Sequence, residues 1–244
     1  MSVIIATTEK RAVVYPETDG EPMAENTLQY EWIVTFKEGI EAVFANRPDV
    51  FVAADLFWYP VEGDNKTRTA PDVLVALGRP KGPRRSYMQW EEGGIAPQVV
   101  IEVLSPGNRS AEMIRKFNFY RKYGVEEYYI YDPDDDELTG WLREGDELTE
   151  IARMDGWKSP RLGITFDRST HPLRVFGPDG RKFLTFQEQR EARERAEHRA
   201  DQAEHRADQA EHRADRAERL AEQLTQRLRA LGFDPFASGE SDPG

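Results

Sequence analysis

Two carboxylates and one ammonium group are placed along this chain in a way that is typical of a hydrolytic metal site. Asp72 follows Pro71 and opens an apolar run, and Glu102 lies inside a second apolar run, residues 98–106. Lys116 lies on the helical stretch that follows. Carboxylates on neighbouring strands can bind a divalent cation that activates a water, and a nearby ammonium can stabilise the attacking hydroxide. The pattern indicates metal-dependent hydrolysis of a phosphodiester bond.

The predicted metal ligands are oxygen atoms, which suit Mg²⁺ or Mn²⁺. Magnesium commonly takes one or two carboxylates together with waters and a phosphate oxygen. Asp72 and Glu102 would supply the carboxylates, and the main-chain carbonyl of Val103 is a candidate third ligand. Glu102 is the most telling residue, because a charge inside an apolar strand is costly unless it has a partner.

Each of these residues also has a plainer interpretation. An aspartate after a proline often only forms a turn. Glu112 stands one helical turn before Lys116, at the spacing of an ordinary surface ion pair. The order and context of the three residues favour a catalytic site, and no single residue does so alone.

The composition limits where the chain works. Its 244 residues suffice for one ordinary domain and an additional segment. It contains no cysteine, which excludes disulfides and thiolate metal sites and suits a reducing compartment. The apolar run at the start is too short for a signal peptide, and no stretch approaches the ~20 apolar residues of a membrane span. We therefore expect a soluble, cytoplasmic protein with no membrane partner.

The net charge of −12 argues against a general nucleic-acid binder, because affinity for phosphates comes mainly from Lys and Arg. Positive charge gathers in residues 79–97, a stretch rich in Gly, Pro and Arg and long for a loop. Tyr87 and Trp90 in this stretch are candidates for stacking on bases, with solvated surface charge as the plainer alternative. The predicted phosphate contacts are Arg79, Lys81, Arg84 and Arg85.

The elements that must position these residues alternate between helical and strand periodicity. A helix that begins at Asn26 and ends before Pro48 has apolar residues at intervals of three and four. A second helix, 109–123, ends at Gly124. Together these predict a mixed α/β core with a helix, a sheet, a second helix and a late hairpin. The predicted strands are 50–58, 72–77, 99–104, 127–131, 137–142, 147–151, 173–176 and 182–186.

From Thr185 the pattern changes to heptads. A capping box, Thr185 to Glu188, opens a helix that runs to Leu231. Along it, small and then larger apolar residues recur at alternating intervals of four and three, which is a coiled-coil seam. The seam consists of Ala196, Ala200, Ala203, Ala207, Ala210, Ala214, Ala217, Ala221, Leu224, Leu228 and Leu231.

The charges that flank this seam favour a parallel pair of helices. With Ala200 at position a, arginines occupy g and glutamates occupy e, so Arg199 would meet Glu204 of the other copy. An antiparallel pair would set like charges together. We predict a parallel coiled-coil homodimer through residues 185–232, which is weak because alanines bury little apolar area. A solitary charged helix is the alternative.

The motif residues resemble the bacterial Uma-two family, which is placed in the restriction-endonuclease-like PD-(D/E)XK superfamily. The resemblance covers about residues 23–180 and implies a mixed four-stranded sheet flanked by helices and a magnesium-dependent nuclease. Together with the periodicity of the chain, it divides the sequence into four predicted parts: an N-terminal arm (1–22), a restriction-endonuclease-like domain (23–184), the heptad helix (185–232) and a disordered tail (233–244). It rests on Pro71-Asp72-Val73, on Val100-Ile101-Glu102-Val103-Leu104-Ser105-Pro106, and on Glu112, Lys116, Tyr120 and Gly124 at intervals of four.

By position, Asp72 matches the aspartate of the superfamily motif and Glu102 the following acid. The usual lysine would stand two residues after Glu102, where this chain has Leu104. In this family the lysine has moved to the next helix, and Lys116 is the matching position. Glu112 stands where the family commonly has Asp.

The resemblance also implies residues around the first ligands: Glu25, Glu31, Glu112 and Tyr120. Two functions from different classes stay open. One is a Mg²⁺-dependent endonuclease that acts on DNA and dimerises through its tail. The other is a catalytically silent scaffold or interaction protein that uses the coil to recruit a partner. A glycosidase with two carboxylates would leave Lys116 without a role.

Overall fold

The structure is a computed structural model that describes residues 13–17, 24, 26–107 and 110–231. The chain separates into two compact units, residues 1–187 and residues 188–244. Most of the predicted arm, the predicted tail and the candidate ligand Glu25 lie outside the described residues.

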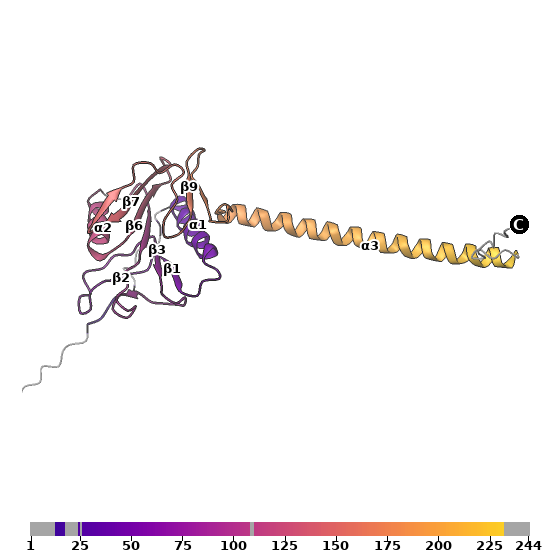
Figure 1. The fold of residues 1–244 in the computed structure, drawn as a ribbon, viewed down its shortest axis with the longest axis horizontal. Helices are drawn as coiled ribbons and strands as arrows, with labels where there is room; N and C mark the ends of the chain where they lie inside the picture. Colours follow the sequence, from indigo (N-terminus) through magenta and orange to yellow (C-terminus); the bar gives the residue numbers. More distant parts are fainter. Residues whose placement is uncertain (1–12, 18–23, 25, 108–109, 232–244) are drawn as a thin grey trace, which may run out of the picture. The chain divides into compact units, whose positions relative to one another are not determined.

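A mixed six-stranded sheet forms the centre of the first unit, with the strands in the order β1, β3, β5, β6, β7, β8 (Figure 1). β5 and β6 run parallel, and α2 (Ser110–Tyr123) makes the crossover between them. The sheet has six strands where the resemblance implied four, because β1 and β8 extend it at its edges. The strands are β1 (Val50–Ala54), β3 (Val73–Leu77), β5 (Val99–Val103), β6 (Glu127–Asp132), β7 (Glu137–Glu144) and β8 (Glu147–Glu150).

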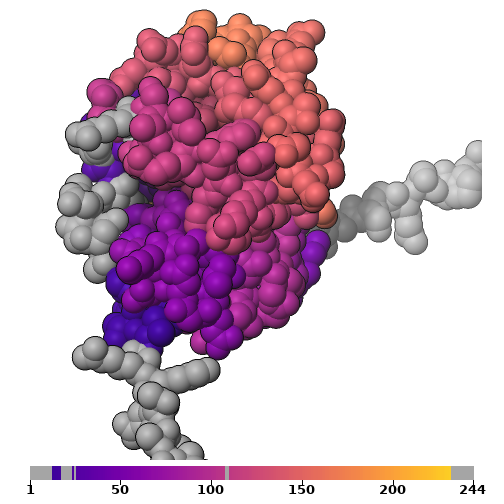
Figure 2. Space-filling view, turned by 90° about the vertical axis from the view of Figure 1, so that its left-hand side faces the viewer, coloured from indigo at the N-terminus to yellow at the C-terminus, as the bar shows by residue number. Residues whose placement is uncertain are grey.

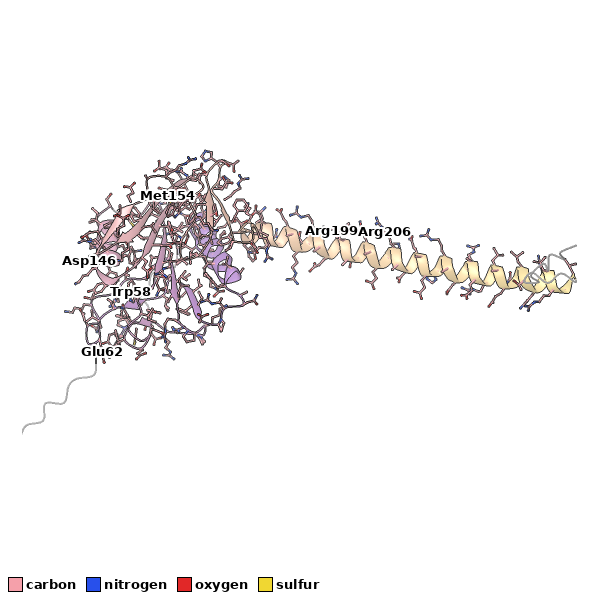
Figure 3. The ribbon with its side chains drawn as sticks, viewed as in Figure 1. Trp58, Glu62, Asp146, Met154, Arg199 and Arg206 are labelled. Atoms are coloured by element: carbon pink, nitrogen blue, oxygen red, sulfur yellow. The ribbon has the colours of Figure 1, made fainter. Side chains whose placement is uncertain are left out.

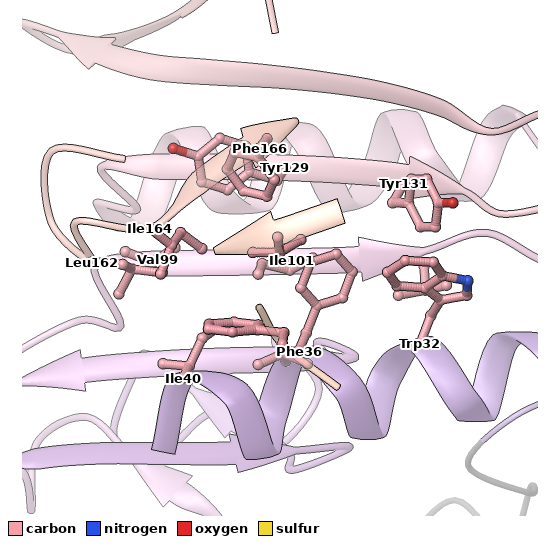
Figure 4. Packing of buried hydrophobic residues seen from close by; sticks show 14 of the residues in the cluster. Trp32, Phe36, Ile40, Val99, Ile101, Tyr129, Tyr131, Leu162, Ile164 and Phe166 are labelled. Atoms are coloured by element: carbon pink, nitrogen blue, oxygen red, sulfur yellow. The ribbon is translucent and has the colours of Figure 1, made fainter. Parts of the chain in front are cut away.

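The helix α1 (Thr27–Val43) covers one face of this sheet. Asn26 caps it, and its side-chain oxygen accepts a hydrogen bond from the Gln29 N–H at 2.8 Å. The apolar stripe of α1 meets aromatic and branched side chains of the strands, which fixes the helix on the sheet. The buried cluster between them includes Trp32, Phe36, Ile40, Val99, Ile101 and Tyr131 (Figure 4).

Side chains along β5 alternate between the two faces of the sheet, as in any strand. Val99, Ile101 and Val103 belong to the α1 face, so Glu102 points to the opposite face, where α2 packs. A second cluster builds that face from Val100, Tyr120, Tyr128 and Leu148. On the α2 side of the unit, the violet residues near positions 60–90 lie directly below the pink residues near 110–150 (Figure 2).

Two predicted strands differ in extent. The run predicted as one strand over 50–58 divides at Asp55, whose φ of +48° lies in the left-handed region and ends β1. After it, β2 (Trp58–Tyr59) pairs in parallel with β4 (Tyr87–Met88). This short pair anchors the 79–97 stretch to the rest of the unit.

The predicted hairpin of 137–142 and 147–151 is present as β7 and β8, whereas the predicted strands 173–176 and 182–186 are paired differently. β10 (Arg174–Phe176) pairs with β9 (Thr165–Asp167), which the sequence analysis missed. Residues 182–186 form no strand, and only a bridge joins Lys182 to Phe176. β9 has three residues, too few for a two-residue alternation to stand out from its surroundings.

The second unit contains most of α3 (Phe186–Ala230), whose side chains project along its whole length (Figure 3). No residue of α3 is buried. Leu220, Leu224, Leu228 and Leu231 are exposed by 40–74%. None of the helices in the described part of the chain is long and apolar enough to cross a membrane.

Candidate active site

The sheet brings Asp72 and Glu102 together. Asp72 directly precedes β3, and Glu102 is in the neighbouring β5. Because Val73 lies opposite Ile101 in this antiparallel pair, the next step places Asp72 opposite Glu102, with both side chains on one face. The Val103 N–H donates a hydrogen bond to Asp72 Oδ2 at 2.6 Å. The predicted meeting of the two carboxylates is therefore what the strand register produces.

Helix α2 supplies the cation. Lys116 Nζ donates to Glu102 Oε2 at 2.8 Å, and the Tyr120 hydroxyl donates to Glu102 Oε1. Lys116 and Tyr120 are four residues apart, so both project from the same face of the helix. The Glu102 side chain is 2% exposed and that of Lys116 17%. The buried carboxylate thus has two donors that offset the cost of removing it from water.

Gln29 is a site residue that the sequence analysis missed. It is buried in the first turn of α1, and its Nε2 donates to the Val103 carbonyl at 2.8 Å. Both main-chain polar groups of Val103 are therefore bound, the N–H by Asp72 and the C=O by Gln29. One signal was available in the sequence: Gln29 continues the buried stripe of Phe36 and Ile40 at helical spacing, and a polar residue on such a stripe is informative.

The charges of the site do not balance. Burial raises the pKa of Asp72 well above its usual range, and the negative charge of Glu102 raises it further, against the opposing effects of Lys116 and the Val103 N–H. Burial alone would lower the pKa of Lys116, but the carboxylates of Glu102 and Asp72 outweigh it, so this pKa is raised. Two carboxyl groups share one ammonium, so ionisation of both would leave one negative charge without compensation.

The donor atoms fit a hard divalent cation. The Asp72 and Glu102 carboxylates and the Val103 carbonyl offer oxygen only, and the excess negative charge would be offset by such an ion. Within residues 13–17, 24, 26–107 and 110–231, no group of three or more acidic, His or Cys side chains gathers at one point. Two carboxylates are nevertheless a common protein contribution to a magnesium site.

Tyr128 adds an unsatisfied hydroxyl to this region. It is fully buried on β6, and its hydroxyl has no hydrogen-bond partner among the residues that the structure describes. Burial, and then the charges of Glu102 and Asp72, raise its pKa, so the hydroxyl lies within electrostatic reach of both carboxylates. A buried hydroxyl without a partner costs about 1–3 kcal/mol. The Tyr128 hydroxyl can therefore still donate a hydrogen bond in this region.

The other candidate residues around the site differ in whether they act on Glu102 or Lys116. Tyr120 contacts Glu102 directly. The charge of Glu112 contributes to raising the Lys116 pKa, as expected for residues one turn apart. Glu31 is half-buried on α1, and its main-chain carbonyl accepts from the Thr35 hydroxyl. The bonds of Asp72, Glu102 and Lys116 described above do not involve the Glu31 carboxylate.

All four predicted phosphate contacts have partners within the chain, and they differ in exposure. Arg79 and Arg84 both pair with the buried Glu92, at 2.9 and 2.5 Å. Lys81 Nζ donates to the Phe44 carbonyl just beyond α1 at 2.7 Å. Arg85 contacts Glu17 at 3.1 Å, yet its side chain remains 83% exposed. The cation best placed to meet a phosphate is therefore Arg85.

The proposed stacking residues of this stretch also differ. Tyr87 is fully buried, stacks on Phe51 and donates its hydroxyl to the Ile95 carbonyl, so the prediction that it stacks on bases is wrong. It fills the core because the β2–β4 pair turns it inward. Trp90 is half-buried, with its ring 5.3 Å from that of Tyr15.

A mixed sheet that joins two carboxylates to a lysine of the following helix defines a nuclease-like α/β domain. Residues 21–169 match the model of the Uma2 family, described as "Putative restriction endonuclease", and the chain belongs to this family. The match confirms the family that the motifs indicated and the restriction-endonuclease-like fold class. In general terms, it supports a nuclease and hence a hydrolase.

Among solved structures, a similar chain is that of "a putative nuclease belonging to DUF820 from Anabaena variabilis". It is 18% identical, with a TM-score of 0.44, and the match covers 60% of this chain and 82% of that one. The comparison with curated proteins finds no match.

Proposed function

We propose that this chain is an endonuclease that uses Mg²⁺ or Mn²⁺ to hydrolyse phosphodiester bonds of DNA. The observation that carries the proposal is the buried Glu102, which lies beside Asp72 and binds the Lys116 ammonium at 2.8 Å. Family membership supports nuclease chemistry in general. The cysteine-free sequence suits a cytoplasmic enzyme, where DNA is accessible.

Each residue has a distinct role in this proposal. Asp72, Glu102 and the Val103 carbonyl would hold the cation, which when bound polarises the phosphoryl group and lowers the pKa of a water. Lys116 stabilises the negative charge of the attacking oxygen and of the transition state. Tyr120 fixes the orientation of the Glu102 carboxylate through its hydrogen bond.

We assign DNA contact within residues 79–97 chiefly to Arg85. Its exposed guanidinium can exchange its ion pair with Glu17 for a phosphate at little cost, because exposed pairs contribute little. Arg79, Lys81 and Arg84 would act mainly by shaping the loop that presents it, since their donors are already bound. Weaker DNA binding by Arg85→Ala, with a shallower salt dependence, is the expected result.

We also propose that residues 23–184 form the nuclease domain and that two copies join in parallel through residues 185–232. The exposed leucines near the end of α3 supply the largest apolar surface of the seam. The double variant Leu224→Glu/Leu228→Glu should be monomeric in light scattering, whereas His205→Glu, at the outward f position, should not change the dimer. A monomeric wild type at high concentration would contradict the proposal.

The alternative, a catalytically silent scaffold, has an observation of its own. The long α3 has no buried residue, and each of the four predicted phosphate-binding cations has a partner inside the chain. A scaffold, however, has no need for two adjacent carboxylates with an excess negative charge. A metal titration separates the two functions.

The deciding experiment is nicking of supercoiled plasmid with Mg²⁺ or Mn²⁺ by wild type, Glu102→Gln and Glu127→Gln. Glu127 is a matched control, because it is equally buried on the neighbouring β6 and bound by Tyr129 and Ser159. Cleavage by wild type and Glu127→Gln, but not by Glu102→Gln, is expected. Cleavage by Glu102→Gln would place the activity elsewhere, and an inactive wild type would favour the scaffold.

A further inference from the structure

We propose that the Lys116 ammonium occupies the place on the Glu102 carboxylate that a divalent cation would take. Binding of the divalent cation would then displace the ammonium, so the two exclude one another at Glu102. The inference rests on the proposed metal site and adds a role for Lys116 before any chemistry occurs. It makes the lysine a competitor of the metal as well as a residue of the reaction.

The first step of the argument is that both Glu102 oxygens are already bound within the chain. Lys116 Nζ lies 2.8 Å from Oε2, and the Tyr120 hydroxyl donates to Oε1. An ammonium and a metal ion both bind the lone pairs of a carboxylate oxygen, and each oxygen has two. A metal ligated by Glu102 therefore has to displace one of these two donors or share an oxygen with it.

The second step concerns which donor leaves. A neutral hydroxyl can remain beside a bound metal ion, whereas an ammonium on the same carboxylate is repelled by it. The repulsion is strong because the Glu102 and Lys116 side chains are largely removed from water. The lysine stem has four carbons with rotatable bonds, so its head can move without a change in α2.

The third step is the charge of the whole site. Two carboxyl groups, those of Asp72 and Glu102, lie beside a single ammonium, that of Lys116. A divalent cation can offset the charges of both carboxylates, so Glu102 no longer needs the ammonium as its counter-charge. Once released, Lys116 can face an anionic oxygen, which it cannot do while it is bound to Glu102.

The main-chain carbonyl of Val103 does not raise the same conflict. Gln29 Nε2 binds it at 2.8 Å, but this donor is a neutral amide, so a metal ion on the second lone pair of the carbonyl oxygen would not repel it as it repels an ammonium. The exchange is therefore confined to the Glu102 carboxylate. If Lys116 were only a structural counter-ion, its removal would damage the fold and leave metal affinity unchanged or lower.

The test is calorimetric titration of Mn²⁺ into the full chain without DNA, for wild type, Lys116→Met, Glu102→Gln and Glu127→Gln. We expect Lys116→Met to bind Mn²⁺ at least ~10-fold more tightly than wild type, since a competing charge is removed. Glu127→Gln should bind as wild type does, and Glu102→Gln should lose the site. Equal or weaker binding by Lys116→Met would overturn the inference while leaving the metal site intact.

A second measurement uses the wild type and does not depend on the fold of a variant. The ¹³Cε resonance of Lys116, assigned by its absence in Lys116→Arg, should shift on addition of Mg²⁺ and reach a plateau as the site fills. A resonance that stays constant while Mg²⁺ binds would overturn the exchange. Absence of Mn²⁺ binding in both wild type and Lys116→Met would instead remove the proposed metal site itself.

Discussion

Glu102 and Glu127 are two buried glutamates on adjacent strands, each 1% exposed, and their surroundings differ in kind. Glu127 accepts hydrogen bonds from the Tyr129 and Ser159 hydroxyls and from the Arg161 N–H. All three donor groups are uncharged. Burial raises the pKa of Glu127, and these hydrogen bonds and the Arg161 guanidinium, which acts from a distance, only partly offset it.

Glu102 accepts hydrogen bonds from a cation and a hydroxyl, and a second acid, Asp72, lies opposite it on the neighbouring strand. The need to satisfy Glu102 does not explain a second acid here, because that acid is itself costly: burial, and then the charge of Glu102, raise the pKa of Asp72. Burial of a glutamate alone is therefore a poor sign of catalysis. The telling feature is a carboxylate placed where it adds an uncompensated charge.

The largest effect is expected from removing the cation that binds Glu102. The matched comparison removes a neutral hydroxyl that binds Glu127. Lys116→Met should reduce the initial rate of plasmid nicking by about 10²–10³, the range for loss of a group that stabilises developing charge. Ser159→Ala, the matched change beside Glu127, should leave the rate within about twofold, because it lies outside the reacting centre. Equal losses in the two variants would remove the distinction between the groups.

A third buried glutamate, Glu92, extends the comparison to stability. It is bound by two arginines, and the Arg84 guanidinium also lies 3.9 Å above the centre of the Phe51 ring. Arg84→Ala should lower the free energy of unfolding by about 3 kcal/mol, because it leaves a buried charge with less compensation. Arg85→Ala should change it by less than ~0.5 kcal/mol, as for other exposed pairs. Urea unfolding of the two variants measures the difference, and similar values would contradict the structural role of Arg84.

The surroundings of these glutamates also show which features of the fold and the site could be predicted from the sequence. The strands around Asp72 and Glu102 were predictable because continuous apolar runs are typical of central strands. The meeting of both acids with Lys116 followed from their order along the chain. Neighbouring strands and the helix that connects to the next strand commonly lie together.

The rest depended on long-range contacts that have no local pattern. Arg84 and Glu92 are eight residues apart in a stretch without periodicity, so their ion pair could not be told from a phosphate-binding charge. The burial of Tyr87 could not be predicted because the β2–β4 pair that buries it has only two residues on each side, too few for a pattern in the sequence. Gln29 reaches Val103 across 74 positions of sequence. Such contacts are decided by tertiary packing.

A smaller effect is expected from Asp72 in the metal-free protein. Its folded-state pKa is raised, so its contribution to stability is complete below the unfolded value of about 3.8 and is lost as pH rises through the folded value. Asp72→Asn removes this loss and should therefore gain stability over wild type with increasing pH, by at most about 1.4 kcal/mol per pH unit within that window. Thermal unfolding in chelator from pH 4 to 8 would show the two curves diverge. Parallel curves would mean that the pKa of Asp72 is not raised in the folded protein.

The smallest effect is expected where an ion pair similar in length to Lys116–Glu102 is exposed. Arg193 and Glu197 on α3 are 2.9 Å apart at the i,i+4 spacing, with side chains 81% and 62% exposed. Arg193→Ala should change helix stability by no more than about 0.5 kcal/mol, measured by circular dichroism on heating. Added salt at 1 M, where the Debye length is about 3 Å, should abolish that difference. A largely buried pair such as Lys116–Glu102 is screened much less. A salt-independent contribution from Arg193 would mean that α3 buries this pair, as only an associated helix could.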